Sequence, residues 1–533
     1  MKTTIQLHQM AKRMVIGVLP ICLFTFLPIK AQVTSASYGL SDQQQIWHQS
    51  RNAAGMAFDF NTADSSANRG IAYFDYQHQE GDYHRVQDGG MKNNLRFFTE
   101  RYQKVGKYLY GYGSFDFNMG RTKDRAWSDV LRSYNSNPFI SGSSVFGKYD
   151  HQDFTLDASL STIQLGHFTY GASIRYEVSD LSRLRDPRSR INLLDYRIMP
   201  SITYSFRNGI PMISATHTLG LALHYDRRKE KLPSLTTVQT DPNLKYYVMT
   251  GLENTTGTIG GYNAYTREYV NHEFGGELSY GFKGLWFKSL NTITLDRGTE
   301  YVYGLYKYEP GRYFNYRYGF STQNRLNSGR MLHSIDAAVN YQQAYADEYR
   351  QERISTTDSI TGYNSIRWNT TLEYRKRFQL KTLDFNFHYR LTFTEEQEQK
   401  GYVGLKYQLQ NVSNKRLLPV STLDYTSHFI ALEGGVNIAG RLSVEALAGY
   451  NSSPKADLNL ANPTTDYAIN VLIPDMNILD ANYFRGHLQL EYQQPIRIAE
   501  KTTQWFARAY GDYLKADHSL KRSLVGVSIG LYY

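Results

Sequence analysis

Cysteine is almost absent from this chain, whose single cysteine, Cys22, lies in an apolar stretch near the N-terminus. The rest of the chain therefore offers no disulfide, no thiolate metal ligand and no cysteine nucleophile. Long apolar runs are lacking as well, because no stretch of about 18 apolar residues follows residue 28. This excludes a membrane protein built from apolar helices, but not one that crosses the bilayer with strands that are apolar on one face only.

Clusters of metal-binding or nucleic-acid-binding residues are also lacking. The 14 histidines form no His-x-His or His-x-x-x-His pair, and no calcium-loop pattern occurs. We therefore expect no metal site and no cofactor. The net charge of +10 falls to +6 when the four basic residues of the first 31 positions are removed, and no dense run of Lys and Arg marks a nucleic-acid contact.

Residues 1–31 have the pattern of a secretory signal peptide. Lys2, Lys12 and Arg13 give a positive start, residues 14–28 form an apolar core, and cleavage is expected after Ala31. Ile21 is too large for the position before a lipoprotein cysteine, so lipidation of Cys22 is not expected. The pattern predicts export across the inner membrane.

The remainder of the chain repeats one signal, an alternation of apolar and polar residues. The last strand shows it clearly, with an apolar face made by Val525, Val527, Ile529, Leu531 and Tyr533. A final strand that ends on an aromatic residue looks like the assembly signal of bacterial outer-membrane barrels, which implies the barrel-assembly machinery as a partner. A soluble multi-sheet protein is the alternative, but its buried strands would be continuous apolar runs, and these are absent.

The same alternation recurs over residues 270–282, 383–394, 483–492 and 505–513. Each apolar face covers about nine residues, which at ~3.3 Å per residue and a ~40° tilt spans roughly 20–25 Å. The 45 tyrosines suit membrane interfaces, where the ring and the hydroxyl face different media. We predict an all-β transmembrane antiparallel barrel over residues 69–533.

Connections alternate in length, as they do in outer-membrane barrels. Counting them predicts about 18 strands, within a range of 16–20. Tight turns, expected to be periplasmic, lie near residues 105–107, 165–167, 207–209, 283–284, 327–329, 379–381 and 439–441, with a longer one at 495–501. Long polar loops, expected to be extracellular, are 121–151, 181–189, 231–265, 297–311, 348–363, 398–422 and 453–482.

Residues 32–68 are too short for a domain, and two interpretations remain open. The segment is either a flexible periplasmic leader or a small hatch in the barrel lumen, with Trp47 packed on the wall and Asn52 and Gly55 in the same run. A TonB-dependent receptor is disfavoured, because it needs a large plug domain before the barrel.

Several short motifs together resemble a known family. They are the signal peptide ending at Ala31, the run Asn52-Ala-Ala-Gly55, Gly81-Asp-Tyr83, Asp186-Pro-Arg188 and the terminal Gly530-Leu-Tyr-Tyr533. They are similar to an uncharacterised family of Bacteroidota outer-membrane β-barrel proteins. The resemblance implies the fold and an outer-membrane location, and it supplies no catalytic residues. The run Asn52-Ala-Ala-Gly55 also has a fainter similarity to fatty-acid-transporter barrels.

Charged residues of both signs recur on the faces expected to line the lumen. They either brace the wall as ion pairs or form a selectivity path in which arginines favour anions. The lumen-lining candidates are Arg317, Arg325, Arg375, Arg377, Arg390, Arg485, Arg508, Glu273, Glu277, Glu491 and Asp512.

The sequence thus predicts passive passage or capture of a small solute, with no enzymatic chemistry because no nucleophile stands at a usable spacing from a histidine. The alternative is a closed structural barrel that serves as a subunit for a lipoprotein or secretion partner. Further expected partners are outer-membrane lipid and lipopolysaccharide, whose phosphates the arginines of residues 183–190 could contact.

Overall fold

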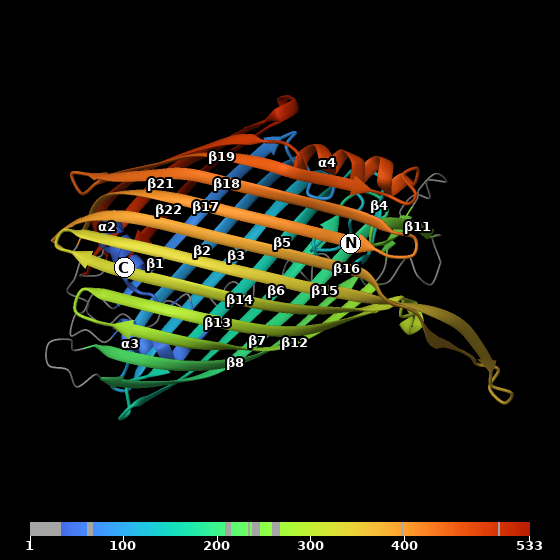
Figure 1. Ribbon diagram of the computed structural model, residues 1–533, viewed down its shortest axis with the longest axis horizontal. Coiled ribbons are helices and arrows are strands. Elements are labelled where there is room, and N and C mark those ends of the chain that lie inside the picture. Colours follow the sequence, from blue (N-terminus) through green and yellow to red (C-terminus); the bar gives the residue numbers. More distant parts are fainter. Residues whose placement is uncertain are drawn as a thin grey trace.

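Eighteen antiparallel strands form a closed barrel in the computed structural model (Figure 1). The structure describes residues 34–48, 50–60, 68–207, 215–232, 235–236, 246–257, 267–396, 398–498 and 501–533, so the predicted signal peptide lies outside the described residues. The barrel strands are β1 (Arg69–Gly81), β2 (Met91–Val105), β3 (Leu109–Arg125), β5 (Gly147–Thr162), β6 (Phe168–Arg183), β7 (Arg188–Arg207), β8 (Thr216–Leu232), β12 (Arg267–Lys283), β13 (Phe287–Tyr303), β14 (Gly311–Ser328), β15 (Met331–Thr357), β16 (Asn364–Glu395), β17 (Glu398–Arg416), β18 (Ser421–Ile438), β19 (Leu442–Asn459), β20 (Tyr483–Ile498), β21 (Lys501–Ala516) and β22 (Lys521–Tyr532).

Each strand pairs with its sequence neighbour in the barrel, and the last pairs with the first. The closing contact between β1 and β22 runs from Ile71 opposite Tyr532 to Gly81 opposite Arg522. Closure leaves no strand edge unpaired, which the lipid core requires. The predicted fold class and strand number are confirmed.

The outer surface of the barrel is apolar. On β12, Phe274 and Leu278 are 62% and 59% exposed. Their neighbours Glu273 and Glu277 are each only 4% exposed and face inward. On β22, Val525, Val527 and Ile529 are all more than half exposed. This is the two-sided pattern of an outer-membrane-type barrel, with lipid outside and polar residues inside.

One end of the barrel carries short turns and the other carries long connections, and we call them the turn end and the loop end. Two predicted boundaries are wrong. Residues 379–381 lie inside β16, and most of the predicted loop 398–422 is β17. The polar residues that indicated a break there lie within continuous strands. In β17, for example, Lys406 faces inward and forms an ion pair with Glu433.

A hairpin made of the ends of β15 and β16 projects beyond the loop end (Figure 1). Strand β16 pairs with β17 only from Phe378 onward, and a register shift separates the hairpin from the barrel near Glu348. Residues 348–375 therefore extend past the wall as a two-stranded arm.

The loop end is filled by connections that fold inward. Strands β4 (Phe139–Ser143), β10 (Tyr246–Thr250) and β11 (Glu253–Gly257) form a separate three-stranded sheet. It packs with Trp127 and with the π-helical turn η4 (Ala468–Leu472), which leads into α4 (Ile473–Leu479). Inward wall residues such as Tyr313 and Phe378 belong to the same apolar cluster, so the loops pack against the inner wall. The other short elements are β9 (Leu235–Thr236), η3 (Leu305–Lys307) and η5 (Asp517–Ser519).

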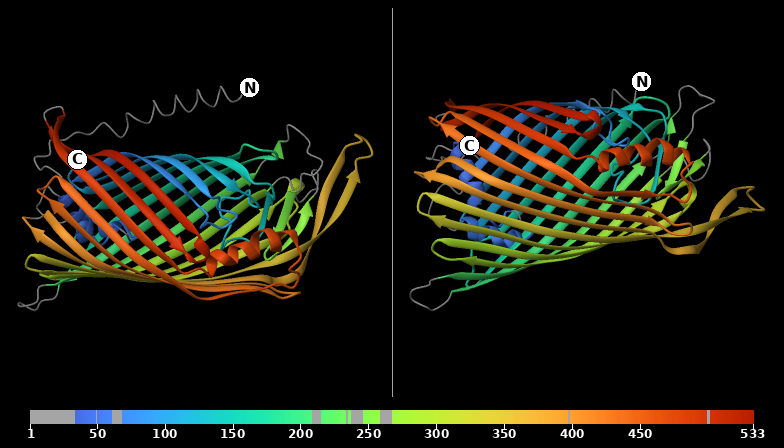
Figure 2. Two further views of the ribbon diagram at one scale, coloured as in Figure 1. Left: turned by 90° about the horizontal axis from the view of Figure 1, so that it is seen from above. Right: turned by 45° about the horizontal axis from the view of Figure 1, so that its top comes forward.

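Residues 34–60 lie inside the barrel at the turn end (Figure 2). They form α2 (Ser35–Gln44), η1 (Ala53–Gly55) and α3 (Met56–Phe60), which we call the docked segment, residues 34–60. Among the helices that the structure describes, none is long and apolar enough to cross a membrane.

Candidate functional site

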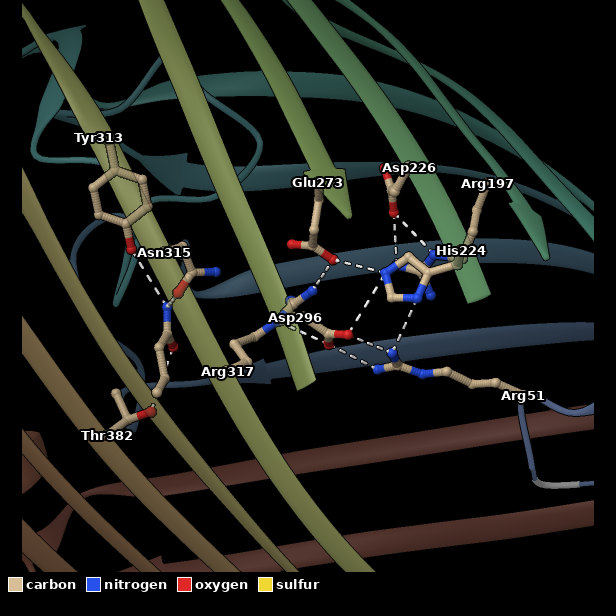
Figure 3. A network of polar contacts seen from close by, with 11 residues as sticks. Arg51, Arg197, His224, Asp226, Glu273, Asp296, Tyr313, Asn315, Arg317 and Thr382 are labelled. Atoms are coloured by element: carbon tan, nitrogen blue, oxygen red, sulfur yellow. Dashed lines mark hydrogen bonds and ion pairs between the residues drawn. The ribbon is translucent and has the colours of Figure 1, made fainter. Parts of the chain in front are cut away.

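The docked segment is attached to the inner wall by polar contacts around Arg51 (Figure 3). The guanidinium of Arg51 binds Asp296 of β13 in a bidentate pair, with Nη1–Oδ1 and Nη2–Oδ2 distances of 2.7 and 3.1 Å. The Arg51 backbone N–H donates to Glu277 of β12 over 3.2 Å, and the Ser50 hydroxyl donates to the same carboxylate. A charged pair with fixed fork geometry orients the segment as well as holding it.

The segment is also fitted to the wall by glycines. A Cβ on Gly171 of β6 would lie 2.3 Å from the Ala54 nitrogen, and one on Gly220 of β8 would lie 2.3 Å from Asn52 Nδ2. A Cβ on Gly281 of β12 would lie 2.6 Å from the Trp47 ring. We call Gly171, Gly220 and Gly281 the dock glycines. Three separate strands thus lack a side chain where the segment approaches.

Buried hydrogen bonds complete the contact at η1. The Ala54 N–H donates to Ser201 Oγ over 3.0 Å, and its carbonyl accepts from Ser161 and Thr169 at 3.1 and 3.0 Å. Asn52 and Ala54 are fully buried. Burial of backbone groups without partners is costly, so these wall hydroxyls favour the docked position.

Trp47 packs in a small apolar cluster with Ile46, Phe58 and the wall residue Leu290. Its ring lies directly over Gly55, where a Cβ would meet the ring at 1.9 Å. Asp59 accepts the Trp47 N–H over 2.8 Å, and burial raises the pKa of the Asp59 carboxyl. The structure therefore places the three residues singled out in the sequence, Trp47, Asn52 and Gly55, against the wall or one another.

Helix α2, the first part of the docked segment, contacts other strands of the wall at the turn end. Arg69 of β1, buried at 1% exposure, donates to the Tyr38 carbonyl, Asp42 and Gln45. The carbonyl of Gln43 accepts from Arg325 of β14. Helix α2 thus covers lumen charges that would otherwise face water.

Three further groups meet next to Arg51, each from a different strand. His224 Nε2 lies 3.6 Å from Glu273 Oε1 and 3.6 Å from Asp296 Oδ1. Arg317 of β14 forms an ion pair with Glu273 and lies 3.6 Å from Asp296. Two carboxylates, two arginines and one imidazole therefore share one patch of the wall, which we call the Arg51 network (Figure 3).

The other lumen candidates form separate ion pairs along the wall. Contacts of 2.5–3.0 Å link them as follows: Arg325 with Asp336, Arg377 with Glu348, Arg390 with Glu433, Arg485 with Asp512 and Arg508 with Glu491. Arg375 differs, because it is exposed in the projecting arm and does not line the wall. The alternation assigned it inward because the period continues through the arm. Each wall arginine named here has a carboxylate beside it, which favours bracing over a free arginine path.

The arginines of residues 183–190 differ in exposure. Arg183 is 2% exposed and donates to Tyr149 and the Val145 carbonyl, whereas Arg188 and Arg190 are exposed beside Asp186 and Asp180. Only part of this run is therefore available to an outside phosphate.

A polar cavity of about 320 Å³ lies inside the lumen, under the inward-folded loops. Its lining is almost entirely polar: Gln77, Gln79, Gln87, Asp88, Lys92, Asn94, Thr122, Arg125, Leu131, Ser133, His151 and Leu524. The volume falls in the range of small-molecule sites, roughly 300–1,000 Å³. Amide, hydroxyl and imidazole groups in such a space bind hydrophilic solutes, and two cations against one carboxylate favour a neutral or anionic one.

A smaller cavity of about 80 Å³ separates the loops from the wall nearby. Asp475 of α4 borders it and accepts the Val86 N–H over 2.9 Å. Burial raises the pKa of Asp475 to about 6. The loop end therefore contains a buried acid whose pKa is raised above its ordinary value.

Sequence reasoning named Glu273 and Arg317 as lumen-lining candidates, but it missed Arg51, His224 and Asp296 and also the dock glycines. The members of the Arg51 network meet only through strand register and through docking of the segment. Glycines in strands were a visible signal, since a strand glycine often marks close approach of another backbone.

The fold and the site define an outer-membrane-type β-barrel with a segment docked in its lumen. The chain belongs to the family described as "Family of unknown function (DUF6850)", whose model matches residues 53–533. The comparison with curated proteins found no match.

Solved structures similar to this chain are outer-membrane transporters and receptors. The copper transporter OprC is 9% identical over 87% of this chain and 80% of its own, with a TM-score of 0.37. The FrpB iron transporter from Neisseria meningitidis is 7% identical over 90% and 83%, with a TM-score of 0.39. The alcaligin receptor FauA from Bordetella pertussis is 8% identical over 87% and 76%, also at 0.39. None of these three is a fatty-acid transporter, and likeness at this level carries no argument about what this chain binds.

Proposed function

We propose that this protein is an outer-membrane barrel that captures a small hydrophilic solute in its lumen and lets it pass when the docked segment moves. The observation that carries the proposal is the polar cavity of about 320 Å³ between the inner wall and the loops. A purely structural barrel has no need for such a space, because packed side chains stabilise a wall better than an empty polar one.

The position of the docked segment supports passage rather than storage. It occupies the turn end through the ion pairs of Arg51 with Asp296 and of Asp42 with Arg69, together with hydrogen bonds and small apolar clusters. Contacts of this kind open and close with modest changes in free energy. Movement of a short segment joins the lumen to the periplasm without rearranging the barrel.

The solute class follows from the charges of the cavity. Lys92 and Arg125 face it with Asp88 as their only acidic counterpart among its lining residues. The amides of Gln77 and Asn94 add donors and acceptors. We infer a solute of sugar size that is neutral or carries a carboxylate.

Conductance and liposome swelling test this proposal. The purified barrel is inserted in planar bilayers and in liposomes, which are then exposed to a neutral monosaccharide, a sugar acid or an amino sugar. We expect channel events, and swelling that is faster with the sugar acid than with the amino sugar. Replacing the two amides, Gln77→Leu with Asn94→Leu, should slow the swelling several-fold. The proposal would be overturned if no channel events occurred at any voltage and no liposomes swelled.

A closed structural barrel is the second candidate. Its supporting observation is the apolar cluster around Trp127, Tyr247 and Tyr467, which packs the loops against the inner wall. The projecting arm of residues 348–375 then offers a surface for a lipoprotein or secretion partner. Co-purification from outer membranes, lost when the arm is shortened, together with absence of conductance, would favour this candidate.

A further inference from the structure

The geometry points to a binding site for a divalent transition-metal ion in the lumen wall, formed by His224, Glu273 and Asp296. The three side chains come from adjacent strands, β8, β12 and β13, and are 1%, 5% and 3% exposed. Their ligand atoms all lie within 4.8 Å of one another. The ion competes with Arg51 for Asp296, which couples metal binding to the position of the docked segment.

The distances fit a tetrahedral ion. Bonds of ~2.1 Å to nitrogen and oxygen place neighbouring ligand atoms about 3.4 Å apart. His224 Nε2 lies 3.6 Å from Glu273 Oε1 and 3.6 Å from Asp296 Oδ1, so small side-chain shifts bring the three atoms to one centre. One imidazole with two carboxylates suits zinc and its neighbours, whereas calcium and magnesium prefer oxygen ligands alone.

Two independent features show that the site is built for an additional group. His224 Nε2 is buried and has no hydrogen-bond partner in the part of the chain that the structure describes, although it points between two carboxylates. A buried polar atom of this kind ordinarily has a partner. Gly275 of β12 lies between the ligands, where a Cβ would be 2.3 Å from Asp296 Oδ1 and 2.4 Å from His224 Cε1. A glycine thus keeps the space open.

Arginines hold the carboxylates when no ion is bound. Asp296 Oδ1 accepts from Arg51 Nη1 over 2.7 Å, and Glu273 Oε1 accepts from Arg317. Arg317 is 38% exposed on the wall, whereas Arg51 belongs to the docked segment. Metal binding and docking therefore oppose each other, and the coupling is reciprocal.

Metal binding is tested with the full chain in detergent by titration calorimetry with Zn²⁺. We expect one site in the wild type, an affinity about tenfold higher in Arg51→Ala because Asp296 is released, and loss of the site in His224→Ala. Gly275→Ala should also lose it, because the methyl group fills the space. His388→Ala is the matched control, since His388 also faces a buried glutamate, Glu433, but not Asp296.

Heat-modifiable migration shows whether each variant folds. If Arg51→Ala and His224→Ala bind Zn²⁺ alike, whether both bind it or neither does, the inference is overturned. Retention of the site in folded Gly275→Ala would overturn it as well.

Coupling to the segment is tested with a single cysteine at Ala57, which is 3% exposed in α3. Zn²⁺ should raise the labelling rate of Ala57→Cys by a polar maleimide several-fold, and should leave it unchanged when His224→Ala is added. Binding without faster labelling would refute the coupling. This last step rests on the proposed passage function, but calorimetry and labelling need no conductance, so failure of either is distinguishable from failure of the passage proposal.

Discussion

Arg51 and Asp296 form a bidentate ion pair that links the docked segment to strand β13 of the barrel wall, with N–O distances of 2.7 and 3.1 Å. Asp296 is nearly fully buried, whereas Arg51 is about a quarter exposed. The pair is shorter than the ion pair of Arg69 with Asp42, at 3.1 Å, and it lies beside the hydroxyls and glycines that contact Asn52 and Ala54. Its removal should therefore loosen the segment more than any other single charge change.

We expect Arg51→Ala to destabilise the docked position by about 2 kcal/mol, because the buried Asp296 loses its fork partner. The segment should then leave the wall more often. The measurement is maleimide labelling of a cysteine placed at Ala57, which should be roughly tenfold faster or more in the variant, with a higher single-channel open probability.

Arg485→Ala provides the matched control for this prediction. Arg485 also forms a lumen ion pair, with Asp512 at 2.7 Å, but it does not touch the docked segment. Labelling at Ala57 should stay at the wild-type rate. Equal acceleration in both variants would show that the wall as a whole had loosened and that the Arg51 pair has no special role.

Adding a side chain at one of the dock glycines should also loosen the docked segment, without changing the charge. Gly171→Val places a Cβ 2.3 Å from the Ala54 nitrogen, which forces the segment away from β6. We expect hydrogen exchange at residues 53–56 to become at least tenfold faster. Gly113→Val is the control, since its Cβ would meet only the Asp157 carbonyl, at 3.9 Å. Unchanged hydrogen exchange at residues 53–56 in Gly171→Val would show that the docked segment tolerates a side chain at this position.

Much of this fold could be predicted from the sequence because strand alternation is a local property. The inward position of Glu273 and the outward position of Val525 follow from period two alone. The break near residue 380 was wrong, since the polar residues Gln379 and Lys381, which look like a turn, lie within the continuous strand β16. The contact between His224 and Asp296 could not be foreseen, because it depends on the register of three strands, and a long connection separates β8 from β12.

The packing of α4 in the loop end should depend on pH. Burial raises the pKa of Asp475 to about 6, so folding favours its protonated form, with Arg85, Asp88 and Tyr134 as its charged or titratable neighbours. The stabilisation is fully present below the ordinary pKa near 4 and is lost as the pH rises through about 6. Amides of residues 468–479 should open more often at pH 7.5 than at pH 5, by a factor of roughly 10. Hydrogen exchange corrected for intrinsic rates measures this.

Asp475→Asn should remove this pH dependence while keeping an oxygen that accepts the Val86 N–H. The neighbouring Asp88 supplies the control, because Asp88→Asn leaves the buried carboxyl in place and should retain most of the dependence. A pH profile that persists in Asp475→Asn would assign the titration to another group.

The final strand should govern assembly more than any lumen charge does. Tyr533 closes the barrel through its backbone, donating to the Gly70 carbonyl over 3.0 Å and accepting from its N–H, while its hydroxyl meets Thr99. An aspartate there would lose the ring contacts and place a charge at the membrane edge of the seam. We expect Tyr533→Asp to reduce the heat-modifiable, membrane-inserted form several-fold, whereas Arg485→Ala should leave its amount unchanged. Normal migration and yield of Tyr533→Asp would show that closure does not depend on the terminal aromatic residue.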